Sequence, residues 1–237
     1  MEKDNLRDIL LEELKKEINV MPVIGQKAPE FTAETTEGVI NFPKDYKGKW
    51  VILFSHPSDF TPVCTTEFMT FASMQEEFRD LNTELIGLSI DSLHSHLAWT
   101  ESIKKMEYNG IKNPVVKFPI IEDLKMNVAK KYGMIQGESD NSAVRAVFFI
   151  NPEGIIKTIL YYPASLGRNF EEIKRILVGL QKVEKEEGIA LPADWKPGKK
   201  HIVAPPRTRE AVDERKELAE KDNKYEMKDW YLTFKED

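Results

Sequence analysis

A single cysteine, Cys64, stands within the segment FSHPSDFTPVCTTEF, residues 54–68. Residues with helical apolar spacing follow it directly, so Cys64 lies at or near the first turn of a predicted helix. Unpaired backbone N–H groups and the positive end of the helix dipole stabilise a thiolate at such a position. Because the thiolate is the nucleophilic form, we interpret Cys64 as reactive. The alternative is a small buried residue, as most free cysteines are.

The residues just before the cysteine suit a reactive sulfur. Thr61 can donate its hydroxyl to the sulfur or to a bound oxygen, although alone it would be read as a helix cap. Pro57 has no N–H group and can shield the site from water, although alone it would only stiffen a loop. A stable thiolate also needs a cation nearby, and an arginine suits this role because its guanidinium stays charged and offers several donors.

The elements that must position these residues alternate along the chain. The predicted strands are 50–55, 84–90, 144–150 and 155–162, and the predicted helices begin near 63 or cover 93–107, 123–132, 169–187 and the segment REAVDERKELAEKD. The turn NPEG joins the last two strands into a hairpin. This order predicts an α/β fold, a mixed sheet with helices on its faces.

Composition shifts suggest three regions. Residues 1–20 predict an amphipathic helical extension, and residues 21–188 hold the α/β domain. Residues 189–237 form a predicted C-terminal arm of mixed α and β structure, in which DWYLTF is a short aromatic strand. The arm is too small to bury a core alone.

Charge and hydropathy exclude several classes of function. The 237 residues carry a net charge of −6 with both signs interleaved, so no basic block predicts nucleic-acid binding. No apolar run is long enough for a membrane span, and the N-terminus lacks the features of a signal peptide. One cysteine cannot form a disulfide within the chain, which favours a reducing cytoplasm.

The histidines do not predict a metal centre. His94 and His96 are spaced i, i+2 on a predicted helix and point in different directions, and no carboxylate cluster joins them. We expect these two and His201 to lie on the surface, and we expect neither a metal nor another cofactor.

The segment PSDFTPVC resembles the P-x-x-x-T-x-x-C signature of the peroxiredoxins of the AhpC/TSA family, which are thiol peroxidases with a thioredoxin fold. Pro57, Thr61 and Cys64 fill its three fixed positions. Two later segments, RAVFFINPEGIIK and GRNFEEI, resemble those that carry the family's two site arginines, here Arg145 and Arg168. The C-terminal VAPPRTREAVDERK resembles the one-Cys branch and its archaeal relatives.

The resemblance implies a role for each residue. Cys64 attacks the peroxide, while Thr61 and nearby backbone N–H groups hold the peroxide oxygens. Arg145 stabilises the thiolate and the charge that spreads over the O–O bond as it breaks. Without the resemblance, an arginine that opens a strand would more often form a surface ion pair. Val63 and His56 line the site; the alternative for His56 is a hydrogen-bonded core histidine.

Two further residues complete the implied site: Pro57 shields the sulfenic acid that forms, and Arg168 orients the site from one side. Met227 and Thr233 occupy the region where some archaeal relatives carry a second cysteine. The cycle therefore needs an external thiol or a thioredoxin-like reductant, and the sulfenic acid is open to overoxidation.

The family also implies a homodimer, often assembled into a decamer, in which the C-terminal arm crosses to the neighbour; the alternative is an arm packed on its own subunit. Two other functions stay open on the sequence alone. One is a peroxide sensor or holdase chaperone that uses the same cysteine. The other is a thioredoxin-fold binding module without catalysis, which the intact set of site residues disfavours.

Overall fold

The computed structural model describes residues 21–136 and 142–236, so the helix predicted over 1–20 lies outside the described residues. The chain divides into two compact units, residues 1–168 and residues 169–237. None of the described helices has the length and apolar character needed to cross a membrane.

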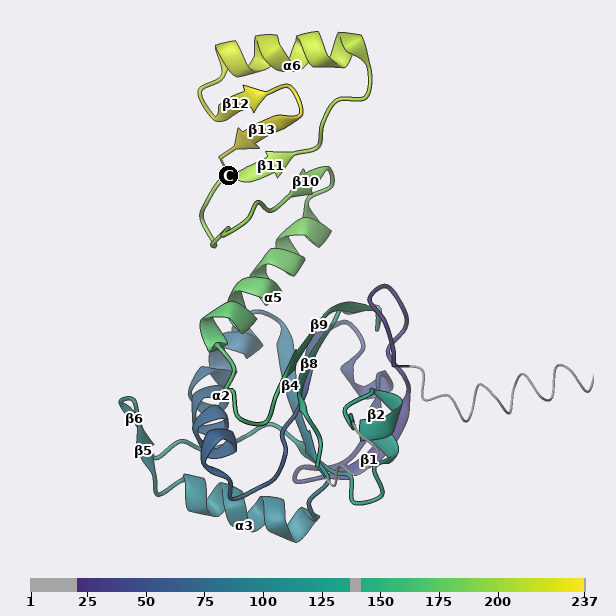
Figure 1. Cartoon of the computed structure of the whole chain (residues 1–237), viewed down its shortest axis with the longest axis vertical. Coiled ribbons are helices and arrows are strands. Elements are labelled where there is room, and N and C mark those ends of the chain that lie inside the picture. The colour runs from purple at the N-terminus through teal and green to yellow at the C-terminus, as the bar shows by residue number, and fades with distance from the viewer. Residues whose placement is uncertain (1–20, 137–141, 237) are drawn as a thin grey trace, which may run out of the picture. The chain divides into compact units, whose positions relative to one another are not determined.

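The first unit is built on a seven-stranded sheet in the order β2-β1-β7-β4-β3-β8-β9. Several of its strands, and helices α2 and α3, are labelled in Figure 1. Its strands are β1 (Phe31–Thr35), β2 (Gly38–Phe42), β3 (Trp50–Ser55), β4 (Thr83–Ser89), β7 (Ile120–Glu122), β8 (Arg145–Ile150) and β9 (Ile156–Tyr162). Strands β3, β4 and β7 are parallel, whereas the other pairs are antiparallel. The predicted mixed sheet with flanking helices is confirmed.

Apolar residues cover both faces of the central strands, which explains why β3 and β8 are buried at every position. One face belongs to a continuous core that includes Val51, Leu53 and Phe148. On the other face Phe54 stacks on Phe71 of α2 (Pro62–Asp80), with ring centroids 4.1 Å apart. Helix α2 is thereby held against the sheet, and α3 (Leu93–Ile103) contacts β7.

Two predicted helices are shorter in the structure. The helix predicted over 93–107 ends at Ile103, and the chain then forms the hairpin of β5 (Glu107–Tyr108) and β6 (Ile111–Lys112), in whose turn Asn109 and Gly110 both take positive φ. An Asn-Gly pair is the usual sequence of such a turn.

The helix predicted over 123–132 is also too long, since α4 covers only Asn127–Lys131. Met126 precedes it with φ 57°, in the left-handed region that interrupts a helix. Residues 31–42, to which the sequence pattern assigned no element, form the β1–β2 hairpin, and the 3₁₀ helix η1 (Lys44–Tyr46) follows.

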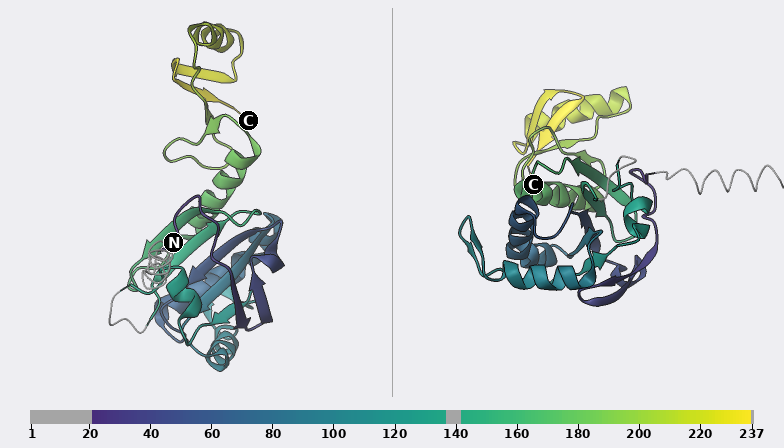
Figure 2. Two further views of the ribbon diagram at one scale, coloured as in Figure 1. Left: turned by 90° about the vertical axis from the view of Figure 1, so that its right-hand side faces the viewer. Right: turned by 60° about the horizontal axis from the view of Figure 1, so that its bottom comes forward.

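The second unit contains helix α5 and a four-stranded antiparallel sheet in the order β10-β11-β13-β12, against which α6 packs (Figure 2). Its elements are α5 (Phe170–Lys185), β10 (Ile189–Ala190), β11 (His201–Val203), α6 (Arg209–Lys221), β12 (Tyr225–Asp229) and β13 (Leu232–Lys235). The prediction that DWYLTF is one strand is wrong, because Trp230 and Tyr231 form the turn between β12 and β13.

Candidate active site

Cys64 is the third residue of α2, which confirms its predicted place in the first turn of this helix. Thr61 is the N-cap residue, with an extended backbone, and Pro62 occupies the first helical position, where its missing N–H costs nothing. The Cys64 residue is fully buried. The amino end of the helix directs unpaired N–H groups and a positive partial charge toward this part of the site.

Arg145 points its guanidinium at the sulfur. It is the first residue of β8, is 2 % exposed, and donates from Nη1 to Cys64 Sγ at 3.2 Å. The Ala164 carbonyl oxygen accepts hydrogen bonds from Nε at 3.1 Å and from Nη2 at 2.7 Å. These bonds fix the plane of the guanidinium, so a positive group is held beside the sulfur before any substrate arrives.

A buried carboxylate, that of Glu67, joins this arginine to the second one. Glu67 is 2 % exposed and lies one helical turn after Cys64. Its Oε2 accepts from Arg145 Nη1 at 2.8 Å and from Arg168 Nη2 at 2.5 Å, while its Oε1 accepts from Arg168 Nε at 2.9 Å. Burial alone would raise the pKa of Glu67, but Arg168 and then Arg145 outweigh it and lower that pKa.

Glu67 was missed by the sequence reasoning. A signal was present, since Glu67 stands within the spacing of the buried residues Cys64, Phe68 and Phe71 on α2. A charge on a buried helix face needs a charged or hydrogen-bonding partner.

Arg168 binds the Glu67 carboxylate and, in the described structure, makes no hydrogen bond to the sulfur. Its Nη1 donates to the carbonyl oxygens of Ser55 at 3.1 Å and of Ala146 at 3.2 Å, and its guanidinium lies over the ring of Phe54, 5.2 Å from the centroid. It ties the end of β3, the start of β8 and Glu67 together. The position suits the orienting role that the resemblance implies.

The remaining predicted residues lie around the start of α2. Thr61 Oγ1 donates to the Ser58 carbonyl at 2.8 Å in this structure, so it neither caps the helix nor meets the sulfur. Pro57 and Val63 are half-buried, and Val63 borders the backbone at Gly167, where a Cβ would lie 3.4 Å from Val63 Cγ1.

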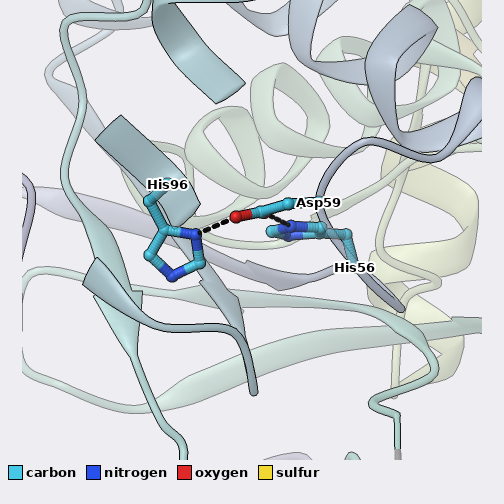
Figure 3. Close-up of side chains that lie close together, drawn as sticks. All are labelled: His56, Asp59 and His96. Atoms are coloured by element: carbon cyan, nitrogen blue, oxygen red, sulfur yellow. Dashed lines mark hydrogen bonds and ion pairs between the residues drawn. The ribbon is translucent and has the colours of Figure 1, made fainter. Parts of the chain in front are cut away.

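The histidines differ from the sequence-based expectation. His94 is exposed as predicted, but His201 and His96 are buried, and the expectation that both lie on the surface is wrong. The expectation that no carboxylate joins His96 is also wrong, because Asp59 contacts it (Figure 3). The sequence reasoning missed this contact because 37 residues separate the two.

His56 belongs to the same cluster. Its Nε2 lies 2.9 Å from Asp59 Oδ1, and its ring stacks on that of Trp99. Within the described part of the chain, His56, Asp59 and His96 are the one group of three or more potential metal ligands, with atoms within 4.8 Å of one another.

The arrangement can support nucleophilic chemistry at sulfur. A thiolate on Cys64 would lie beside the Arg145 guanidinium and within the first turn of α2. Such donors, fixed before reaction and away from water, stabilise the charge that develops as a bond breaks.

Comparisons with known proteins agree with this chemistry. Residues 24–159 match the model of the AhpC/TSA family, and residues 179–218 match the C-terminal domain of 1-Cys peroxiredoxin. A peroxiredoxin of Methanosarcina mazei is 63% identical over 219 residues, which cover 92% of this chain and 99% of the relative. A peroxiredoxin of Methanocaldococcus jannaschii is 49% identical over 221 residues, covering 91% and 99%.

Two solved structures resemble the chain along nearly its whole length. One is a yeast mitochondrial 1-Cys peroxiredoxin, with a TM-score of 0.76 and 37% sequence identity; the match covers 92% of this chain and 100% of the yeast chain. That structure is described with its thiol resolving mechanism via glutathione/thioredoxin systems. A mutant of peroxiredoxin 6 of Arenicola marina has a TM-score of 0.78 and 32% identity, covering 91% and 98%.

Proposed function

The chain belongs to the AhpC/TSA family of peroxiredoxins, and from this membership we propose that Cys64 is the nucleophile of its thiol peroxidase activity. The predicted family, the activity and the thioredoxin-like fold are confirmed by these relatives. One observation carries the assignment of the nucleophile: Arg145 Nη1 donates to Cys64 Sγ at 3.2 Å, at the amino end of α2.

In the proposed first step the Cys64 thiolate attacks the terminal oxygen of a hydroperoxide. An S–O bond forms as the O–O bond breaks, the sulfur is oxidised to sulfenic acid, and the leaving alkoxide or hydroxide takes a proton from solvent water to become an alcohol or water. Arg145 stabilises the charge that spreads over the O–O bond. Thr61 and Val63 lie on the segment that meets the peroxide, and Thr61 turns its hydroxyl from the Ser58 carbonyl to the substrate.

An external thiol completes the proposed cycle, because the chain has one cysteine. Its sulfur condenses with the sulfenic acid to give a mixed disulfide and water, and a second thiol then restores Cys64 and leaves as the disulfide. The yeast relative is described with glutathione and thioredoxin systems, which supports a thiol or thioredoxin-like donor for this chain too. Pro57 shields the sulfenic acid, and Arg168 orients Glu67 and, through it, Arg145.

We further propose a homodimer, assembled into a decamer, and a place in the reducing cytoplasm. The proposed division puts the peroxidase domain at 21–188 and the dimerisation arm at 189–237, and the match of residues 179–218 to the C-terminal domain of 1-Cys peroxiredoxin supports a separate arm. Size-exclusion chromatography with light scattering, on the full chain and on a chain truncated after residue 188, tests this assembly.

A sensor or holdase function of the same cysteine is not favoured, because curated relatives and solved structures of peroxiredoxins match more than nine tenths of the chain. The direct test is steady-state consumption of hydrogen peroxide with dithiothreitol as the donor. We expect Cys64→Ser to lose all protein-dependent consumption. Wild-type turnover by Cys64→Ser would refute the assignment of the nucleophile, and a wild-type enzyme that reacts once but never turns over would favour the sensor.

A further inference from the structure

Asp59 and His96 have no part in the reaction as proposed above, yet both are buried beside the loop that leads from β3 into α2 (Figure 3). Asp59 lies on this loop, and His96 lies on α3. Asp59 Oδ2 is 2.8 Å from His96 Nδ1, and its Oδ1 is 2.9 Å from His56 Nε2. The other ring nitrogen of His96, Nε2, lies 3.2 Å from the Ile121 carbonyl oxygen.

These contacts assign the protons of the cluster. A carbonyl oxygen and an ionised carboxylate can only accept hydrogen bonds, so both nitrogens of His96 must donate and the ring is an imidazolium. A protonated Asp59 would allow a neutral His96, but the carboxyl is held ionised. Burial alone would raise the pKa of Asp59, yet the hydrogen bonds from His56 and His96 outweigh burial and hold that pKa below its ordinary value.

His56 carries one proton, on the nitrogen that faces Asp59. Its Nδ1 is buried without a hydrogen-bond partner, and burial lowers the pKa of His56. The ring is held between Trp99, with centroids 5.1 Å apart, and Phe68, at 4.7 Å. The Asp59 carboxylate therefore accepts one hydrogen bond from a neutral ring and one from a charged ring.

The loop that these bonds anchor is strained. Phe60 follows Asp59 with φ 55°, in the left-handed region, and is 59 % exposed, so its own side chain does little to hold that conformation. A non-glycine residue in this conformation is strained and persists only where its surroundings determine the backbone. Asp59 supplies that constraint twice, through its carboxylate and through its backbone N–H, which donates to Asp91 Oδ2 at 3.0 Å. Thr61 is the residue directly after Phe60.

We propose that Asp59 and His96 are positioning residues of the peroxidase reaction, which fix the strained loop 56–61 and thereby place Pro57 and Thr61 against the peroxide. The proposal rests on the function proposed above. It assigns the cluster to the peroxide side of the site, whereas Arg145 and the end of α2 act on the thiolate.

A metal ion is the competing reading of the cluster. It would displace the hydrogen bonds that the facing atoms of His56, Asp59 and His96 now make to one another. It would also need a fourth ligand in a site from which both rings are closed to solvent. A network of charge-assisted hydrogen bonds accounts for the same distances without either requirement.

The test separates the peroxide step from the reactivity of the thiol. For full-length Asp59→Ala and His96→Gln, stopped-flow kinetics would measure kcat/KM for hydrogen peroxide, and iodoacetamide alkylation of Cys64 would be followed against pH. We expect kcat/KM to fall about 10- to 100-fold, the range for a small misplacement of substrate contacts, while the alkylation profile stays as in wild type. Asp59→Asn should lie between wild type and Asp59→Ala.

Asp59→Asn is informative because the amide can accept from His56 and donate to a neutral His96, keeping the contacts and losing the charge. His94→Gln is the matched control, an exposed histidine two residues from His96 on α3, and should behave as wild type. ¹⁵N solid-state NMR of histidine-labelled wild type should show a doubly protonated ring whose signal is missing in His96→Gln. This measurement stands even where Asp59→Ala does not fold.

Several results would overturn the proposal. The first is a kcat/KM for hydrogen peroxide within twofold of wild type in both Asp59→Ala and His96→Gln. The second is a loss of the alkylation rate in parallel with the peroxide rate. The third is an NMR signal that shows His96 to be singly protonated. A stoichiometric metal that EDTA removes together with activity would replace it with a metal site. Activity in Cys64→Ser would instead remove the proposed function, so the two failures are distinguishable.

Discussion

Replacing Arg145 by alanine removes the one side-chain cation that contacts the sulfur in the described structure. Two unit charges 3.2 Å apart interact by about 5 kcal/mol at an effective dielectric constant of about 20. The Glu67 carboxylate, 2.8 Å from the same guanidinium nitrogen, cancels part of that field. We therefore expect a loss of about 3 kcal/mol, similar to the removal of one oxyanion-hole donor, which is about 10²- to 10³-fold in rate.

Two measurements check this value. Stopped-flow oxidation by hydrogen peroxide should give kcat/KM lower by about 10²- to 10³-fold for Arg145→Ala. The pH of half-maximal alkylation of Cys64 should rise, because loss of a positive neighbour disfavours the thiolate. Glu67 keeps its bonds to Arg168, so the variant should remain folded, which a urea unfolding curve would establish.

Two controls isolate the contact with the sulfur. Arg168→Ala keeps the Arg145 contact and should cost less than tenfold in rate, although it removes bonds to the Ser55 and Ala146 carbonyls. Arg175→Ala removes a partly exposed arginine paired with Glu172 and should change neither rate nor alkylation. An Arg145→Ala enzyme within threefold of wild type, with an unchanged alkylation profile, would refute the electrostatic reasoning.

The other predictions concern stability and oxidation. Glu67→Gln leaves two buried guanidinium groups without their carboxylate and should lower the free energy of unfolding by about 3–5 kcal/mol in urea titrations; a change under about 1 kcal/mol would contradict the ion-pair argument. Burial lowers the pKa of His56 from 6.5, so the ring is neutral in the folded protein and takes up a proton when the chain unfolds. The free energy of unfolding should therefore decrease as the pH falls below about 6.5, by up to about 1.4 kcal/mol per pH unit, and the decrease should be less steep in His56→Gln. The pKa of Asp59 lies below its ordinary value of 3.8, so this carboxylate stabilises the folded protein above pH 3.8, and the stabilisation is lost as the pH falls through the native pKa. In Asp59→Asn the free energy of unfolding should therefore depend less on pH in the acid range. With excess peroxide and no thiol, intact-mass analysis should find Cys64 as sulfinic acid, whereas oxidation confined to methionines would speak against a reactive thiolate.

Local patterns in the sequence were enough to predict the start of α2 and the residues around it. Cys64, Thr61 and Pro57 lie within eight residues, and the properties of a helix N-terminus depend on neighbours in the chain. The buried strands were equally visible, since β3 and β8 are continuous apolar runs. Short elements such as β7 and the β5–β6 hairpin were missed or misassigned, because two or three residues carry too little periodicity to identify a strand.

The positions of Arg145 and Arg168 were predicted through the resemblance to a family, and periodicity alone gave no sign of them. The structure adds the carboxylate that both arginines share. Glu67 is separated from Arg145 by 78 residues and from Arg168 by 101, so no local spacing relates them. Their meeting depends on the order of strands in the sheet and on the side to which α2 packs.

By itself the sequence identified the candidate for the reacting atom, because a lone cysteine at a helix start is defined by covalent neighbours and by hydrogen bonds within one turn. Only the tertiary structure decided which charges surround that atom and which histidines are buried. Charge and burial act through space, and the free energy of an ion pair such as Arg145–Glu67 or His96–Asp59 depends on distances and desolvation that arise when remote segments pack together.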